Sequence, residues 1–282
     1  MKKFVLTILF FLLLFSGFSQ SPFPTRENMD AFLNSKTLVV LDNSSFLGYN
    51  IYIKKAVQEY WKITDYDFVD YKELEKRRYD STYSFLMLTK ISIEKDKEEA
   101  YYNFLNLLLG GNAETITDMP EFGSVPLSYT DVDEKKYIYK LGLIVQFLQD
   151  HVKFIEQNID MTALGNLKYY NKNIPLIKDK VLLIAEGDLT AEVDSMDKIK
   201  EIYPYEIKIV PHAEIEKAID NRDENIVFLH KVGPEGTNIN ARCYKIIIGA
   251  NDGKFYFFNF HTINNKRPDG FLARDFKRIA RF

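Results

Sequence analysis

The feature that most constrains the fold is an internal repeat, because the same order of predicted elements occurs twice along the chain. The first copy begins with an apolar run at 36–42 and the second with a similar run at 180–186, and each run ends in a carboxylate. Continuous apolar runs of this length are typical of strands that are buried on both faces of a sheet. Helices are therefore expected to cover the sheet of each copy.

A helix, an alternating strand, a short charged helix and a third strand follow the opening strand in both copies. These elements are predicted at 53–61, 66–71, 73–76 and 83–88 in the first copy and at 196–202, 205–210, 213–219 and 226–230 in the second. An apolar run that ends in a Gly/Asn turn comes next, at 107–112 and at 246–251. Asp252 and Gly253 between two strand patterns are a strong hairpin signal. The return strand at 254–260 is clearer than its first-copy counterpart near 114–119.

Each copy closes with a helix, at 133–157 in the first and at 272–282 in the second, so the repeated unit has the order β-α-β-α-β-β-β-α. Right-handed crossovers make the first three strands of a unit parallel, and the hairpin extends the sheet in the antiparallel direction. The chain is therefore predicted to be α/β, with two tandem copies of this unit, each a mixed sheet covered by helices. One continuous sheet through both copies is the alternative.

The domain boundaries follow from this repeat. The prediction is a signal peptide at 1–19, an N-terminal linker at 20–35, the first repeat with its long closing helix at 36–157, a linker at 158–179 and the second repeat at 180–282. The second linker is placed by its Asn and Pro residues, which are typical of loops.

The first residues have the layout of a secretory signal peptide. Lys2 and Lys3 form a basic start, followed by the almost entirely apolar run 4–15. Gly17 and Ser19 then put small residues at the −3 and −1 positions of a cleavage site. The apolar run is shorter than the roughly 20 residues of a spanning helix, which argues against an uncleaved membrane anchor. With no cysteine at the cleavage point for lipidation, we expect a periplasmic or secreted protein without a stable membrane anchor after cleavage.

The net charge and the cysteine content limit the kinds of partner and the source of stability that we expect. The formal net charge is −3 at pH 7, which argues against nucleic acid or an anionic membrane as the main partner. The single cysteine, Cys243, lies in an apolar stretch and cannot close an internal disulfide, so the stability of an exported chain must come from core burial. Cys243 is expected to be a small buried side chain on a strand rather than a nucleophile.

Polar side chains follow the opening strand of each copy. Ligands of α/β sheets usually bind beyond the carboxyl ends of parallel strands, so these residues form a candidate ligand rim. The rim consists of Asp42, Asn43, Ser44, Ser45, Glu186 and Asp188. Residues of these types also initiate turns and cap helices, which is the simpler interpretation. Because the loop lacks the glycines of a phosphate cradle, nucleotide binding is not expected.

The chain has four histidines, which are His151, His212, His230 and His261. None has a second histidine four residues away or a cysteine cluster nearby, so no metal or other cofactor is predicted. His230 and His261 both sit at strand ends of the second copy, and with Glu235 or Asp252 they could form an acid/base group. The first copy has no counterparts of these histidines, and no catalytic residue is assigned.

The long helix after the first copy carries two apolar stripes. The first is Ile138, Leu141, Val145, Leu148, Val152 and Ile155, and the second is Tyr137, Ile144, Phe147, His151 and Phe154. One stripe is enough to pack the helix on its own sheet. The second stripe needs another partner, which is either the other copy in the same chain or a separate protein, so its residues form a candidate interface. His151 is expected to be a satisfied interface histidine rather than a pH sensor.

The C-terminal segment carries a resemblance. The stretch 243–260, followed by 267–272 and 275–278, resembles the C-termini of exported, uncharacterised two-repeat α/β proteins of Bacteroidota. A Phe-rich signal that ends in Ser19 and Gln20 fits that source. The resemblance implies an envelope protein and carries no functional residue across.

These features together predict a non-enzymatic periplasmic or secreted binding or accessory protein that holds a protein partner or self-associates. The prediction depends on the lack of a convergent acid/base or metal pattern and on the surplus apolar stripe of the long helix. The alternative is a small-molecule binder or a hydrolase that uses the strand-end loops near Asp42 and Glu186.

Overall fold

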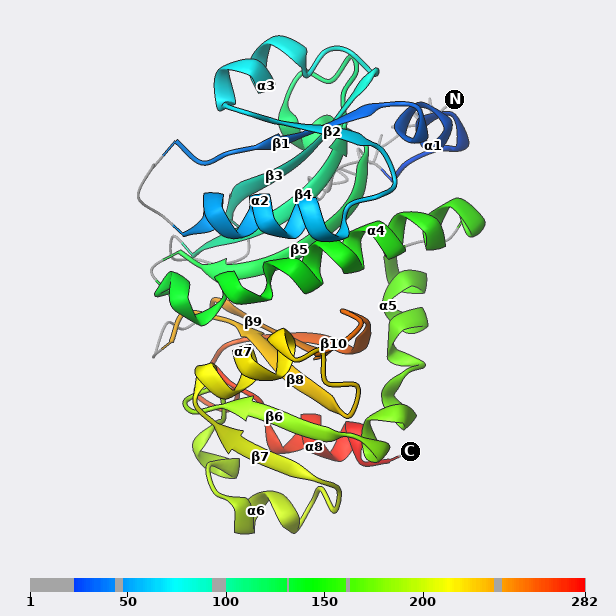
Figure 1. The fold of residues 1–282 in the computed structure, drawn as a ribbon. Helices are drawn as coiled ribbons and strands as arrows, with labels where there is room; N and C mark the ends of the chain where they lie inside the picture. Colours follow the sequence, from blue (N-terminus) through cyan, green and yellow to red (C-terminus); the bar gives the residue numbers. More distant parts are fainter. Residues whose placement is uncertain are drawn as a thin grey trace, which may run out of the picture.

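The computed structural model describes residues 23–43, 48–92, 100–130, 132–160, 163–235 and 240–281. The predicted signal peptide at 1–19, as well as Ser44 and Ser45, lies outside the described residues. The described strands form two five-stranded sheets, with the orders β2-β1-β3-β4-β5 and β7-β6-β8-β9-β10 (Figure 1). The two sheets have the same topology, so the predicted two-unit α/β fold is confirmed and the alternative of one continuous sheet is wrong.

The strands of the first sheet are β1 Lys36–Val40, β2 Asp65–Val69, β3 Tyr83–Ser92, β4 Tyr101–Leu109 and β5 Glu121–Tyr129. Those of the second sheet are β6 Val181–Ala185, β7 Ile207–Val210, β8 Ile226–Val232, β9 Arg242–Gly249 and β10 Phe255–Thr262. In the first sheet β1 lies parallel to β2 and β3, and β4 and β5 continue it in the antiparallel direction. The second sheet repeats this arrangement with β6 at the position of β1.

The helices are α1 Arg26–Leu33, α2 Tyr49–Tyr60, α3 Tyr71–Arg77, α4 Leu141–Gln157, α5 Ala163–Asn171, α6 Met196–Lys200, α7 His212–Asp220 and α8 Ala273–Ile279. Two 3-10 turns, η2 Glu134–Lys136 and η3 Ile138–Lys140, precede α4 in the segment predicted as one long helix. The return strand predicted near 114–119 is wrong, because Thr115 and Asp118 close a capping box around a 3-10 turn there. The return strand is β5 instead.

Both segments predicted as linkers contain helices. Helix α1 begins at a capping box of Thr25 and Asn28, and its buried Phe32 stacks on Phe122 of β5 with ring centroids 4.4 Å apart. Helix α5 covers the edge of β10, where the side-chain amide of Asn171 accepts from the backbone N–H of Phe258 at 2.8 Å and donates to its carbonyl at 3.1 Å. This contact satisfies the backbone groups of Phe258 at a strand edge, and an uncovered edge is a template for pairing with another chain.

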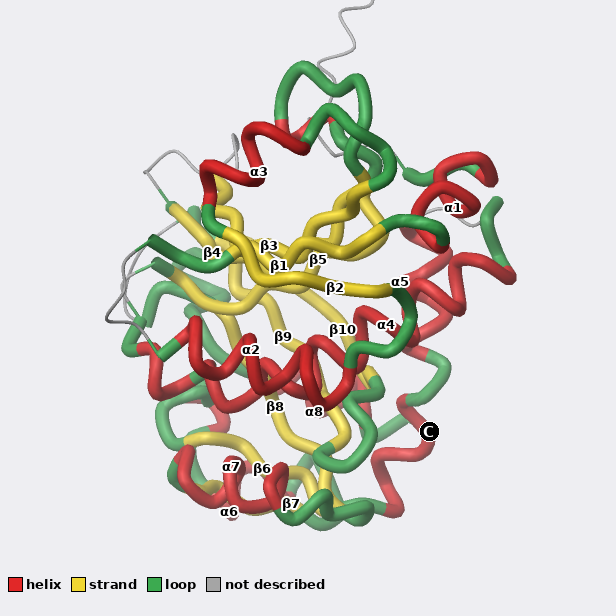
Figure 2. The backbone as a smooth tube through the Cα atoms, turned by 45° about the horizontal axis from the view of Figure 1, so that its top comes forward, coloured by secondary structure: helices red, strands yellow, loops and turns green. Residues whose placement is uncertain are grey.

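The helices and sheets alternate in layers. Helix α3 packs on the outer face of the first sheet, where Leu74 shares a buried cluster with Phe85. Helices α2 and α4 cover its inner face, so the strands of the first sheet lie above them in Figure 2. The second sheet has α6 and α8 on its outer face, with Ile199 and Phe276 in the buried cluster. Helix α7 and, again, α4 lie on its inner face.

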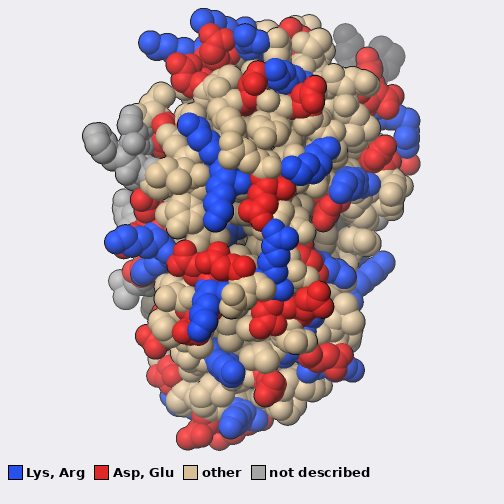
Figure 3. Space-filling view, in the orientation of Figure 1, with Lys and Arg blue, Asp and Glu red and all other residues tan. Residues whose placement is uncertain are grey.

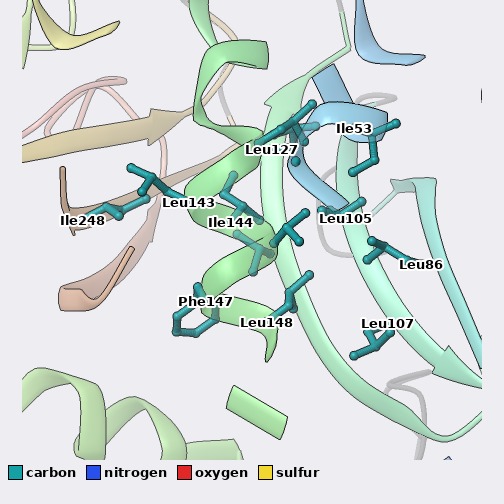
Figure 4. Packing of buried hydrophobic residues seen from close by; sticks show 14 of the residues in the cluster. Ile53, Leu86, Leu105, Leu107, Leu127, Leu143, Ile144, Phe147, Leu148 and Ile248 are labelled. Carbon is teal, nitrogen blue, oxygen red and sulfur yellow. The ribbon is translucent and has the colours of Figure 1, made fainter. Parts of the chain in front are cut away.

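Helix α4 is therefore shared by the two units. Figure 4 shows Leu143 beside Ile248 of the second sheet, whereas Leu105 and Leu107 of the first sheet lie on the other side of the helix. Phe147 stacks on Phe255 of β10, with ring centroids 3.5 Å apart and ring planes 3° apart.

One glycine makes this approach possible. Gly253 in the β9–β10 hairpin has a φ of +64°, and a Cβ there would lie 2.6 Å from the carbonyl oxygen of Leu143. Any side chain at this position would push the hairpin away from α4.

The second stripe of α4 is covered by the same chain. Ile144 is fully buried, and Phe147 packs between β10 and α5. His151 hydrogen-bonds through Nδ1 to the hydroxyl of Tyr170 at 2.5 Å, and Phe154 stacks on Tyr169. Most of the candidate interface is therefore an internal seam between the units, in which Ile144 and Phe147 are buried, whereas Tyr137, His151 and Phe154 are partly buried.

Candidate functional site

The described residues of the predicted ligand rim do not form one site. In the first unit, Asn50 bonds the backbone N–H and carbonyl of Asp42 at 2.9 Å each, which closes the loop between β1 and α2. Asn43 is exposed. In the second unit Glu186 is exposed, but Gly187 with a φ of +87° turns the chain so that Asp188 is buried. Of the described rim, only Asp188 points into an enclosed site.

Asp188 belongs to a group of ionisable side chains between the two units, which we name the polar cluster. It consists of Lys140, Asp188, His212, His230, Lys231 and Asp269. These residues come from η3, from the loop after β6, from the start of α7, from β8 and from the loop before α8. The cluster thus lies at the carboxyl ends of β6 and β8, which is where ligands of α/β sheets usually bind.

The cavity at this cluster is small. Its volume is about 20 Å³, which is room for one water molecule. The partly exposed side chains of Lys136 and Glu235 line it and form an ion pair of 2.7 Å that joins the two units. The ionisable side chains of the cluster therefore have room for a water molecule beside them but not for a larger ligand.

His230 ties the first sheet to the second. Its Nε2 lies 2.9 Å from the carbonyl oxygen of Pro126 in β5, so Nε2 carries the proton and Nδ1 is free to accept from Lys140, 3.5 Å away. Burial, reinforced by the charge of Lys140, lowers the pKa of His230 to about 3. His230 is thus a neutral structural side chain at neutral pH.

Burial shifts the pKa values of Lys140 and Asp188 in the direction that favours their neutral forms. Burial lowers the pKa of Lys140 to about 8, although Asp188 opposes this shift. Burial raises the pKa of Asp188 to about 6, against the influence of Lys231 and Lys140. Among the described residues Lys140 makes no ion pair, so its charge is only partly compensated.

Lys231 of the polar cluster and Lys245 lie opposite each other on β8 and β9, and each is paired with a carboxylate. Burial opposes the charge of Lys231, but Asp269 at 2.6 Å and Asp188 at 3.7 Å together raise its pKa. Lys245 bonds Asp275 at 2.5 Å, and this carboxylate also accepts from the backbone N–H of Leu272. Burial lowers the pKa of Lys245.

The predicted pairing of His230 with His261 is wrong. His261 lies opposite Cys243 on β9, whereas His230 lies opposite Ile246. These two β9 positions are three residues apart, and side chains alternate along a strand, so the histidines lie on opposite faces of the sheet. The predicted acid/base partners are engaged elsewhere, since Glu235 pairs with Lys136 and Asp252 accepts from the backbone N–H of Lys254 in the hairpin.

Cys243 is fully buried, as expected from its apolar stretch. Its Sγ accepts from the backbone N–H of Gly270 at 3.4 Å, and burial raises the pKa of the thiol. The thiolate that a nucleophile requires is therefore disfavoured.

A groove that the sequence did not predict runs between the units on the face drawn in Figure 3. Helices α2 and α7 form its walls and α4 its floor, and its volume is about 410 Å³. The floor contains Ala56, Tyr139, Gly142 and Leu143, and the rim contains Lys55, Glu59, Glu216, Asp220 and Arg222. Figure 3 shows charged side chains of both signs in a band across the middle of this face.

The groove is bridged by Arg222 and connected to the polar cluster. Arg222 pairs with Glu59 of α2 and donates to the hydroxyl of Tyr60 at 3.5 Å. Tyr139, in the floor, hydrogen-bonds Nδ1 of His212 at 3.0 Å, and His212 lines the cavity of the cluster. The groove has no signal in the sequence, because its walls come from helices of different units.

No family model, curated protein or solved structure matches the chain. In the part of the chain that the structure describes, no helix is long and apolar enough to cross a membrane. Within the same described ranges, no group of three or more His, Cys, Asp or Glu side chains is placed to hold a metal ion.

Replacing the two buried lysines Lys140 and Lys245 should change the free energy of unfolding differently, because only Lys245 is bonded to a carboxylate. We expect Lys140→Met to leave the free energy of unfolding at pH 7 unchanged or to raise it, because burial disfavours the charged form. We expect Lys245→Met to lower it by about 3–5 kcal/mol, because Asp275 is left buried and unpaired. Urea denaturation of both variants checks this. A loss of several kcal/mol in Lys140→Met would contradict the account.

All four histidines are buried enough to disfavour their charged forms. Burial is the largest cause for each of them, and lowers the pKa to about 4 for His151, about 4 for His212, about 3 for His230 and about 4 for His261. The ordinary pKa of histidine is about 6.5, so the unfolded chain binds more protons than the folded one below that pH. The stability that these histidines contribute is present above pH 6.5 and lost as the pH falls towards 4.

The buried carboxyls of Asp188 and Glu121 change the stability with pH in the opposite direction to the histidines. Burial raises the pKa of Asp188 to about 6 and that of Glu121 to about 7, so their contribution is largest in acid and is lost as the pH rises through those values. Because four groups oppose two, we expect a net loss of stability between pH 6.5 and 4. Denaturation across this range should show a shallower loss for His151→Phe, which keeps the ring stack and cannot be protonated. A stability that is flat with pH would contradict the prediction.

Proposed function

We propose that the protein is a non-enzymatic binding protein that acts in the periplasm or outside the cell and holds a segment of a protein partner in the groove between α2 and α7. The observation that carries this proposal is the groove itself, which both units line and whose floor is apolar. Beside it, the side chain of Ile51 is 71% exposed although it is large and apolar. Exposed apolar surface with a polar rim is typical of interaction sites.

The state of the reactive groups favours binding over hydrolysis. The polar cluster surrounds a cavity with room for one water molecule, and Cys243 is buried as a thiol. A substrate would need to displace the ion pair of Lys136 and Glu235 to reach Lys140 or Asp188. These groups are better explained as the polar part of the contact between the units.

A small-molecule ligand is the second candidate for the same groove. Its volume of about 410 Å³ falls within the range of small-molecule pockets, and Tyr52, Tyr60 and Tyr139 could contact an apolar ligand. This candidate moves the predicted small-molecule site away from the loops near Asp42 and Glu186, which the fold separates from the groove lining.

Peptides selected by phage display on the mature chain test the proposal. We expect them to bind about tenfold or more weakly to Ile51→Asp, because a charge replaces an apolar contact at the edge of the groove. Affinities are measured by calorimetry.

Leu176→Asp is the matched control, since Leu176 is an exposed apolar residue (45%) in the 3-10 turn Ile174–Asp179, which does not line the groove. It should leave the affinities unchanged. Peptides that bind Ile51→Asp and wild type equally would contradict the proposal.

A further inference from the structure

The patch around the groove carries complementary features side by side. Ile51 projects from the start of α2 and is the most exposed of the large apolar side chains that the structure describes. Next to it lies the apolar floor formed by Ala56, Gly142 and Leu143. A projection and a hollow in one patch can fit a second copy of the same patch, in which each projection enters the other hollow.

The charges of the two walls are complementary in the same way. The α2 wall has Lys55, and the α7 wall has Glu216 and Asp220. Among the described residues no ion pair joins Lys55 to either carboxylate across the groove. The remaining charges of the rim, Glu59 and Arg222, are paired with each other.

From these features we infer that the occupant of the groove is a second copy of this chain, related by a two-fold axis. This inference rests on the proposed function and names the partner of the same site. The two-fold axis places Lys55 of each copy opposite Glu216 and Asp220 of the other, and Ile51 of each copy over the apolar floor of the other. Complementary charges of this kind select the partner and its orientation.

A second copy satisfies this surface better than a segment of one charge sign. A basic segment suits Glu216 and Asp220 but meets Lys55 as a like charge, and an acidic segment has the reverse problem. Because a stable interface buries about 800 Å² on each partner, the outer surfaces of α2 and α7 beside the groove must also be covered. We expect this dimer to form reversibly, so that its population rises with protein concentration.

Sedimentation velocity of the mature chain over a range of concentrations tests the inference. The expected result is a mass that rises from one chain towards two for wild type and for Leu176→Asp. Ile51→Asp should stay at the mass of one chain at every concentration. The circular dichroism spectrum and melting temperature of each variant show that it is folded.

A charge exchange makes the test specific to these walls. Lys55→Glu makes the groove acidic on both walls, and the double variant Glu216→Lys, Asp220→Lys makes it basic on both. Each variant alone should be monomeric, because both of its contacts are repulsive. An equimolar mixture of the two should form a heterodimer, in which both contacts are attractive again.

Two results would overturn the inference: wild type that is monomeric at every concentration, or a dimer that Ile51→Asp and the charge variants leave intact. The proposed function fails separately. Selected peptides that depend on Ile51 and bind a strictly monomeric chain would support the groove as a binding site while removing the second copy as its occupant.

Discussion

The structure depends on one helix serving two sheets. Helix α4 buries one side against β4 and β5 and the other against β9 and β10, and the stack of Phe147 on Phe255 lies at the centre of the second contact. A helix that closes a single α/β unit needs only one apolar stripe. In a free unit the second side of this helix would face solvent. In this chain that side is apolar and packs on the second sheet, so the two units share one core.

The other features between the units follow from this sharing. Once β5 and β8 are brought together, His230 can donate to Pro126 and must remain neutral there, and Lys140 is buried beside it. The ion pairs of Lys136 with Glu235 and Arg222 with Glu59 join the units at the surface. The groove arises because α2 and α7 flank α4 in the same layer without filling the space between them.

The element order, the parallel and antiparallel strands and the second stripe of α4 could be predicted from sequence, because apolar periodicity and the repeat report them directly. The site could not. Glu186 and Asp188 look equivalent in sequence, and only the left-handed turn at Gly187 buries one and exposes the other. His230 and His261 look like a pair until the register of β9 puts them on opposite faces. Helices α1 and α5 were missed because their roles, a buried Phe32 and an edge-covering Asn171, are contacts with distant strands.

Native-state hydrogen exchange, resolved by segment, tests the central claim that both units share one core. The account predicts that amides of α4, β4 and β9 exchange through openings of the same free energy, because no unit keeps its core without α4. Phe147→Ala should lower that free energy by about 3–5 kcal/mol in both sheets alike. If Phe147→Ala lowered protection in the second sheet and left the first unchanged, the units would be independent and the claim would be contradicted.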